Sequence, residues 1–99
     1  MAIMEISVIP LGTKTPSVSK YVAEALKILE KEKDIKYELT SMGTIIEGDL
    51  RKVLNLAKKM HEAVFDKEIL RVATIIKIDD RRDKPLSIEG KIKSVQEKL

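Results

Sequence analysis

Carboxylate and hydroxyl side chains are unusually dense in the stretch 37–49, near the middle of this 99-residue chain. Thr40, Thr44 and Glu47 fall there on segments rich in residues that favour β-strands. Hydroxyls can donate to the ring nitrogens of a heterocycle, and a carboxylate can accept from an amine or offset a cation. A similar segment lies near the N-terminus. The candidate ligand-binding residues are therefore Glu5, Ser7, Thr40, Thr44 and Glu47.

Each of these residues also has a purely structural explanation. Glu47 could pair with Lys77 or with another lysine. Threonine is an ordinary strand residue, so Thr44 alone is weak evidence for a site. Ser7 points more strongly to function, because a small hydroxyl residue in a central strand gives up packing. The residues alone leave both explanations open.

The residue types that most catalytic and metal sites need are scarce. The chain has no cysteine, which excludes disulfides, thiolate catalysis and zinc sites built on cysteine. His61 is the only histidine and has no second ligand at a suitable spacing, so we expect it to have a partly buried structural role. No nucleophile with an adjacent base can be assembled. We therefore expect no catalytic residue, no metal and no cofactor.

Two further motifs carry charge without a clear ligand. Residues 12–15 resemble the end of a phosphate-binding loop, but the upstream glycine of that motif is missing. The segment 79–85 holds three aspartates with Arg81 and Arg82, at a spacing that is not that of a calcium loop. We expect ion pairs that brace this connection, or contacts between subunits.

Composition argues against nucleic acid and membrane partners. The net charge is +3, and acidic and basic residues are interspersed without a long run of one sign. No apolar run approaches the ~20 residues of a membrane helix, and no signal peptide is recognisable. RNA recognition in a small sheet usually needs exposed aromatic residues, and Tyr37 is the one aromatic residue on a predicted strand. We expect a cytoplasmic domain. Its abundance of Lys, Glu and Ile resembles hyperthermophile composition.

The candidate residues lie on predicted strands, and the spacing of apolar residues changes along the chain between that of a strand and that of a helix. The first strand places Met4, Ile6 and Val8 on one apolar face. Thr15 and Pro16 have the residue types of a helix N-cap and first position, and Asp49 is a second predicted N-cap. The predicted strands are 3–9, 36–40, 44–47 and 71–79, and the predicted helices begin at Thr15, Asp49 and Ser87.

This order predicts one domain spanning residues 1–99, of the α+β class. The β-α-β-β-α-β succession is that of a ferredoxin-like antiparallel sheet with two helices on one face, here with an additional C-terminal helix. Tyr21 and Phe65 are expected in its core.

The other face of the sheet, which no predicted long helix covers and which we call the open face, is expected to mix polar and apolar side chains. Such a surface is too apolar to be fully hydrated and too polar for a dry core. The C-terminal helix or a second subunit could cover it and leave a pocket, or the face could simply be hydrated. The expected members of the face are Ile3, Glu5, Ser7, Ile9, Glu38, Thr40, Glu47, Ala73, Ile75 and Lys77, and those of the C-terminal stripe are Ile88, Ile92, Val95 and Leu99.

Three segments together resemble the small thiamine-binding protein family related to the YkoF proteins. They are PLGT at 10–13, MGTIIEG at 42–48 and DDRRDK at 79–84, in a similarity that runs from about residue 3 to the C-terminus. One departure is Asp66-Lys67-Glu68, where the family often has a glycine. The resemblance implies a ferredoxin-like fold, dimers or tetramers formed through the sheet and last helix, and binding of thiamine or its hydroxymethylpyrimidine part without catalysis.

The candidate residues are compatible with that ligand. An aminopyrimidine presents an amine and ring nitrogens, which suit a carboxylate and hydroxyls, and Glu5 and Glu47 could offset the cationic thiazolium. We therefore expect an oligomer that binds thiamine or a related pyrimidine in a pocket on the open face or at a subunit interface. The alternative is a regulatory or interaction module of the same topology that senses another small molecule, such as an amino acid. A third possibility, an enzyme of thiamine metabolism, would require side chains that act as a general acid and a general base.

Overall fold

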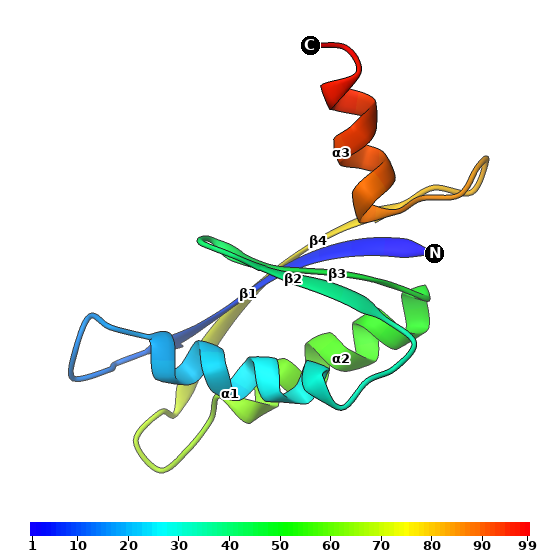
Figure 1. Ribbon diagram of the computed structural model, residues 1–99. Helices are drawn as coiled ribbons and strands as arrows, with labels where there is room; N and C mark the ends of the chain where they lie inside the picture. The colour runs from blue at the N-terminus through cyan, green and yellow to red at the C-terminus, as the bar shows by residue number, and fades with distance from the viewer.

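The structure, a computed structural model, describes all of residues 1–99. Its elements follow the predicted order, including the additional helix at the C-terminus (Figure 1). They are β1 (Ala2–Leu11), α1 (Ser19–Glu30), β2 (Lys36–Thr40), β3 (Gly43–Gly48), α2 (Leu50–Ala63), β4 (Arg71–Asp80) and α3 (Ile88–Gln96).

The four strands form one antiparallel sheet in the order β2-β3-β1-β4. The helices α1 and α2 cover the same face of this sheet (Figure 1). The predicted ferredoxin-like α+β fold is therefore confirmed. The register is fixed along the whole of β1, where Glu5 lies opposite Ile45 of β3 and Lys77 of β4.

The core lies between the sheet and the two helices. Met4 and Ile6 are fully buried there, and Val8 packs against them with partial burial, as the alternation of the first strand predicts. Tyr21 is in the core as expected, but Phe65 is 41% exposed and is not. Phe65 follows the end of α2, where its ring meets the edge of His61 at a centroid distance of 5.3 Å.

Of the three predicted helix starts, those at Asp49 and Ser87 are confirmed and the one at Thr15 is wrong. The Asp49 side chain caps α2 by accepting from the backbone amides of Arg51 and Lys52. Thr15 does not cap α1, which begins four residues later without a side-chain cap. The hydroxyls of Thr13 and Thr15 instead bond the backbone of the loop 13–17, and such local bonds compete with helix formation.

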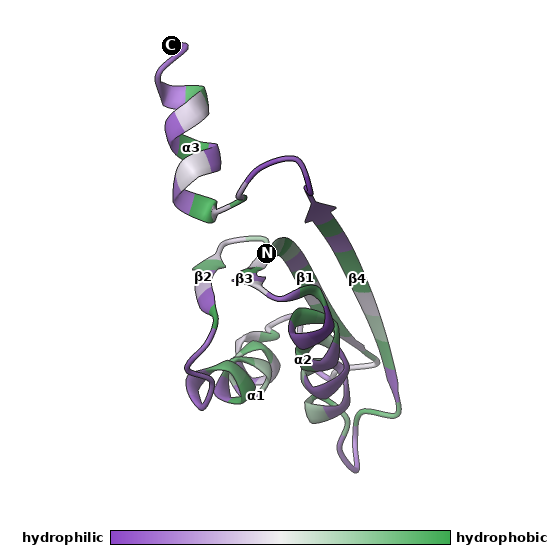
Figure 2. Ribbon diagram, turned by 90° about the vertical axis from the view of Figure 1, so that its right-hand side faces the viewer, coloured by the Kyte–Doolittle hydropathy of each residue, from purple (hydrophilic) through white to green (hydrophobic).

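The helix α3 stands away from the rest of the molecule (Figure 1, Figure 2). Only its start is buried, where Ile88 and the preceding Leu86 pack on Ile3 of the open sheet face. Ile92 and Val95 are 48% and 61% exposed. The apolar stripe of the C-terminal helix therefore covers the open face with its first residue and not along its length.

Candidate functional site

The sheet face opposite α1 and α2 presents its side chains in rows that cross the strands. It is the open face. The row under the start of α3 contains Lys36, Glu47, Ile3 and Asp79; the next contains Glu38, Ile45, Glu5 and Lys77; the third contains Thr40, Gly43, Ser7 and Ile75. Four of the five candidate residues, Glu5, Ser7, Thr40 and Glu47, thus share this face.

Thr44 does not join the other four. It lies opposite Ile6 of β1 and Leu39 of β2, on the helix-facing side of the sheet, and is 4% exposed. Alternation along β3 puts Thr44 and Ile46 on one side and Ile45 and Glu47 on the other.

Glu47 is the buried carboxylate of the open face, with 7% of the residue exposed. Its Oε1 accepts a hydrogen bond from the backbone amide of Ile88 at 2.8 Å. Neither of the lysine pairings considered for Glu47 forms: Lys77 lies 3.7 Å from Glu5 instead. Burying a carboxylate is costly unless it is hydrogen-bonded, and the first amides of a helix are natural partners. Glu47 therefore joins β3 to the start of α3.

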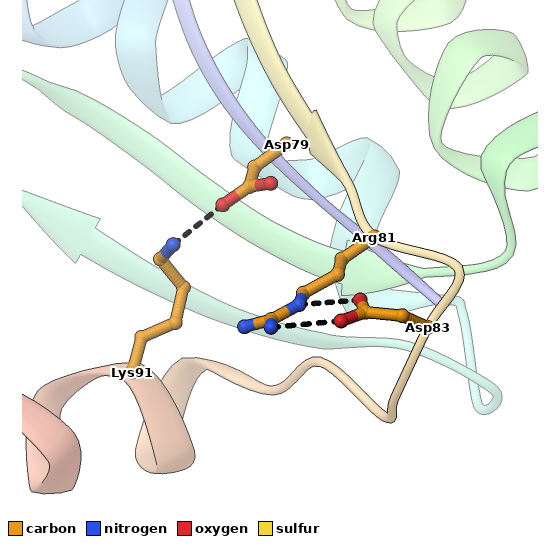
Figure 3. Close-up of polar contacts among 4 residues, drawn as sticks. All are labelled: Asp79, Arg81, Asp83 and Lys91. Carbon is orange, nitrogen blue, oxygen red and sulfur yellow. Dashed lines mark hydrogen bonds and ion pairs between the residues drawn. The ribbon is translucent and has the colours of Figure 1, made fainter.

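Two exposed ion pairs flank this buried contact. Lys36 of β2 lies 3.9 Å from Glu89 on one side, and Lys91 bonds Asp79 of β4 on the other. Figure 3 shows Lys91 reaching from α3 to Asp79. Within the helix, Ser87 Oγ accepts from the amide of Gly90 at 2.9 Å and so caps its N-terminus. The first turn of α3 is thus tied to both edges of the first row.

A cavity of about 350 Å³ lies between β2 and the start of α3. It is lined by Ile35, Lys36, Tyr37, Glu38, Glu47, Ile88 and Glu89. Its volume is at the lower end of the range for small-molecule sites. Glu47 is the one candidate residue among its lining. Glu5 lies on the next row of the open face.

The hydroxyls of Ser7 and Thr40 are used within the hairpin that joins β2 to β3. Ser7 Oγ donates to the carbonyl of Met42 at 2.9 Å, and Thr40 Oγ1 donates to the carbonyl of Gly43 at 2.8 Å. Their oxygens keep acceptor capacity. In this arrangement the two hydroxyls fix the turn and do not present a free proton to a ligand.

The charged segment 79–85 is braced by ion pairs, as predicted. Arg81 makes two bonds to the carboxylate of Asp83 (Figure 3), and Arg82 bonds Asp80. The guanidinium partners lower the pKa of both aspartates from their ordinary value. A second cavity, of about 530 Å³, lies between this segment and the start of α2. No group of three or more histidine, cysteine, aspartate or glutamate side chains is placed to hold a metal ion.

His61 connects α2 to β4. Its Nδ1 lies 2.6 Å from Thr74 Oγ1, and its ring meets the edge of Phe65. The residue is partly buried, which agrees with the structural role expected for it.

Sequence reasoning did not identify Ile35, Tyr37, Ile88 and Glu89 as part of a cavity. Ile88 carried a signal as the first residue of the C-terminal apolar stripe. Tyr37 lies on the helix side of β2, and because β2 is an edge strand the residue remains 39% exposed beside the cavity. No pattern in the sequence indicates that α3 begins above Glu47.

None of the three helices has the length and apolar character that a membrane span requires.

The known proteins to which this chain is similar match it over nearly its whole length. The profile of a family described as thiamine-binding proteins matches residues 4–96. The UPF0045 protein YqgV of Bacillus subtilis is 53% identical over 102 residues, which cover 100% of this chain and 98% of the relative.

Two solved structures have the same fold. The crystal structure of hypothetical protein MJ1052 from Methanocaldococcus jannaschii has a TM-score of 0.87 and 44% sequence identity, and the match covers 97% of this chain and 96% of that one. A Thermotoga maritima protein, named for a proposed part in thiamine biosynthesis or salvage, has a TM-score of 0.77. It is 18% identical, with coverage of 95% and 97%, and this likeness concerns the fold alone.

Proposed function

The chain belongs to the thiamine-binding protein family, and on this basis we propose that it binds thiamine or the hydroxymethylpyrimidine part of thiamine and catalyses no reaction. The observation that carries the proposal is Glu47, a buried carboxylate in the wall of a cavity beside the open face. One of its oxygens is held by Ile88, and the other has no hydrogen-bond donor from the chain.

An aminopyrimidine suits the cavity in size and chemistry. Its exocyclic amine can donate to the second oxygen of Glu47, and its ring can lie against the side chain of Ile88, beside the edge of the sheet at Ile35 and Tyr37. Hydrogen bonds that involve a charged group are stronger than neutral ones, about 1.5–3 kcal/mol net. The proposed pyrimidine position is therefore the Glu47 cavity.

The rest of thiamine would lie over the second row of the open face. Glu38 and Glu5 are carboxylates in that row, with Ile45 between them. A cationic thiazolium is favoured where carboxylates are in surplus. Glu5 forms an ion pair with Lys77, whose Nζ lies 3.7 Å from Glu5 Oε1, a distance typical of a weak exposed pair. Glu38 makes no ion pair within the chain and supplies the surplus charge.

We propose binding without catalysis because the side chains at the Glu47 cavity suit ligand binding. The one histidine is bonded to Thr74, away from the Glu47 cavity. General acid-base chemistry needs a positioned proton donor or acceptor at the reacting atom. The carboxylate of Glu47 is already engaged by Ile88, which fits an orienting role.

We propose that a second copy of the chain completes the site. Ile92 and Val95 are exposed on α3, Leu99 is exposed beyond its end, and Ile75 is 63% exposed on the open face. A helix of nine residues is marginal in water without tertiary packing. A dimer or tetramer that brings these apolar surfaces together would bury them and enclose the ligand.

Calorimetric titration of the purified protein with thiamine and with hydroxymethylpyrimidine tests the proposal. A dissociation constant in the micromolar range corresponds to about −8 kcal/mol, which several hydrogen bonds and apolar contacts can supply. Amino acids titrated in parallel test the alternative of a regulatory module. Absence of heat and of any thermal shift at millimolar thiamine would refute the proposed function. A response to an amino acid in place of thiamine would select the alternative.

A further inference from the structure

We propose that ligand binding and the docking of α3 on the sheet are coupled, so that ligand orders α3 and strengthens the assembly that α3 mediates. This inference rests on the proposed function, since it takes the Glu47 cavity as the ligand site. It adds a regulatory consequence: the C-terminal helix reports whether the site is filled.

The cavity has walls from two elements that are distant in the sequence. Tyr37, Glu38 and Glu47 come from the hairpin β2–β3, and Ile88 and Glu89 come from the first turn of α3. If α3 leaves the sheet, the second wall is lost and the cavity becomes an open surface. A ligand in the cavity touches both walls and therefore binds the docked state in preference to the undocked state.

The docking of α3 is shallow enough to be displaced. Its apolar part is limited to Ile88 and Leu86 on Ile3, with Ile45 beside them. The ion pairs on either side are exposed, with Lys91 and Asp79 each about half exposed. Exposed ion pairs stabilise little, and the remainder of α3 has no contact partner along its apolar stripe. Local opening of such a segment needs little free energy.

Glu47 is the chemical link between the two events. Its Oε1 holds the amide of Ile88, and its second oxygen faces no donor from the chain. A ligand amine at the second oxygen leaves the bond to Ile88 in place and offsets the buried negative charge. Linkage then requires that ligand favours docking by the same factor by which docking favours ligand.

Docking also fixes how α3 presents Ile92 and Val95 to a second copy. Because the helix stands upright on the first row of the open face, a change at its first turn moves the whole stripe (Figure 1). An undocked helix presents this stripe in no fixed direction. Filling the cavity is therefore expected to shift the monomer–oligomer equilibrium toward the oligomer.

Hydrogen exchange with and without thiamine, on the full chain, provides the first readout. The amides of Ile88, Gly90 and Lys91 are bonded to Glu47, Ser87 Oγ and the Ser87 carbonyl. Saturating thiamine is expected to slow their exchange by about fivefold or more, in the range of typical coupling factors. The amide of Val53, bonded to the carbonyl of Asp49 at the start of α2, serves as the internal control and should not change.

A matched pair of variants provides the second readout. Lys91→Glu replaces the attraction to Asp79 with a repulsion between two carboxylates and so weakens the docking of α3, whereas Lys93→Glu changes an exposed lysine that pairs with Glu97 inside the same helix. Neither residue lines the cavity, and both variants change the net charge equally. Lys91→Glu is expected to raise the thiamine dissociation constant about fivefold, and Lys93→Glu less than about twofold.

The outcomes separate this inference from the proposed function. Thiamine binding with unchanged exchange in α3, and with equal affinities for the two variants, would overturn the coupling and leave the proposed function intact. No binding to any variant or to the parent chain would overturn both. Binding with slowed exchange in α3 and a selective loss in Lys91→Glu supports the coupling.

Discussion

The carboxylate of Glu47 on β3 accepts a hydrogen bond from the backbone amide of Ile88 at 2.8 Å, across 41 residues of sequence. This contact explains why a charged residue is buried on a short strand next to Gly48. It also places one carboxylate at the boundary of three features: the hairpin, the C-terminal helix and the cavity between them.

Glu47→Gln should separate binding from stability. The glutamine amide keeps an acceptor oxygen for Ile88 but loses the charge that favours an amine or a cation. We expect thiamine affinity to fall about five- to tenfold, the difference between a charged and a neutral hydrogen bond, with little change in Tm. Calorimetry and thermal unfolding measure the two effects. Glu62→Gln, on the exposed side of α2, is the control. Unchanged affinity in Glu47→Gln would remove Glu47 from the site.

Glu47→Ala should destabilise the protein as well. It leaves the buried amide of Ile88 without its acceptor, and an unpaired buried donor costs about 1–3 kcal/mol. Faster hydrogen exchange at Ile88, with α2 amides unchanged, would locate the effect in α3. Equal stability of the alanine and glutamine variants would show that solvent replaces the carboxylate at no cost.

Acid should destabilise the fold partly through Asp66. Its Oδ1 accepts from the amides of Ile69 at 2.7 Å and Glu68 at 2.8 Å, and these bonds lower the pKa of the carboxyl from 3.8. Because the folded pKa lies below the unfolded one, the stabilisation is complete above the unfolded pKa. It is lost as the pH falls through the folded pKa. Urea unfolding from pH 7 to about pH 2 should therefore show a shallower acid decline for Asp66→Asn than for the parent chain.

The same series has a clear control and a clear contrary result. Glu62→Gln removes an exposed carboxyl that makes no hydrogen bond and should keep the parent's pH dependence. An identical acid decline in Asp66→Asn and the parent would mean that the paired carboxylates of Asp80 and Asp83, whose pKa values are also lowered, account for the whole effect.

Local periodicity was sufficient to predict the fold and one surface of the site. The period of two along β1 places Glu5 and Ser7 opposite the apolar set of Met4 and Ile6, and the structure confirms both faces. The cap at Asp49 was predictable because it depends on the side chain and the next three amides.

The remaining features depend on tertiary structure. Adjacent Ile45 and Ile46 hide the phase of β3 in the sequence, so the inward direction of Thr44 needed the register with Ile6. The partner of Glu47 is set by where a connection of several residues delivers α3, and no local pattern encodes that position. The length of α1 was overestimated because the hydroxyls before it had a competing use in the loop.

Gly43 is predicted to be intolerant of a side chain. An added Cβ would lie 2.9 Å from Ser7 Oγ and 3.0 Å from the carbonyl oxygen of Ile6. We expect Gly43→Ala to lower the free energy of unfolding by about 1–3 kcal/mol, the usual cost of overpacking. Urea unfolding measures this, with Ser41→Ala in the adjacent turn as the control. Adding Ser7→Ala should restore only part of the lost free energy of unfolding, because the backbone contact with Ile6 remains. Full restoration would show that the Ser7 hydroxyl was the sole obstacle.

The exposed stripe of α3 is predicted to hold subunits together. Ile92 and Val95 are exposed although they continue the apolar series that begins at the buried Ile88. Charges at these positions should prevent a second copy from packing there and should leave the core of the subunit intact. We expect Ile92→Glu with Val95→Glu to convert the oligomer to monomer by light scattering, with Tm lowered only as far as dissociation requires. Leu70→Glu introduces one charge at an 81% exposed residue in the α2–β4 connection and should leave the oligomer unchanged. A parent chain that is monomeric at high concentration, or a double variant that still assembles, would place the subunit contact elsewhere or exclude it.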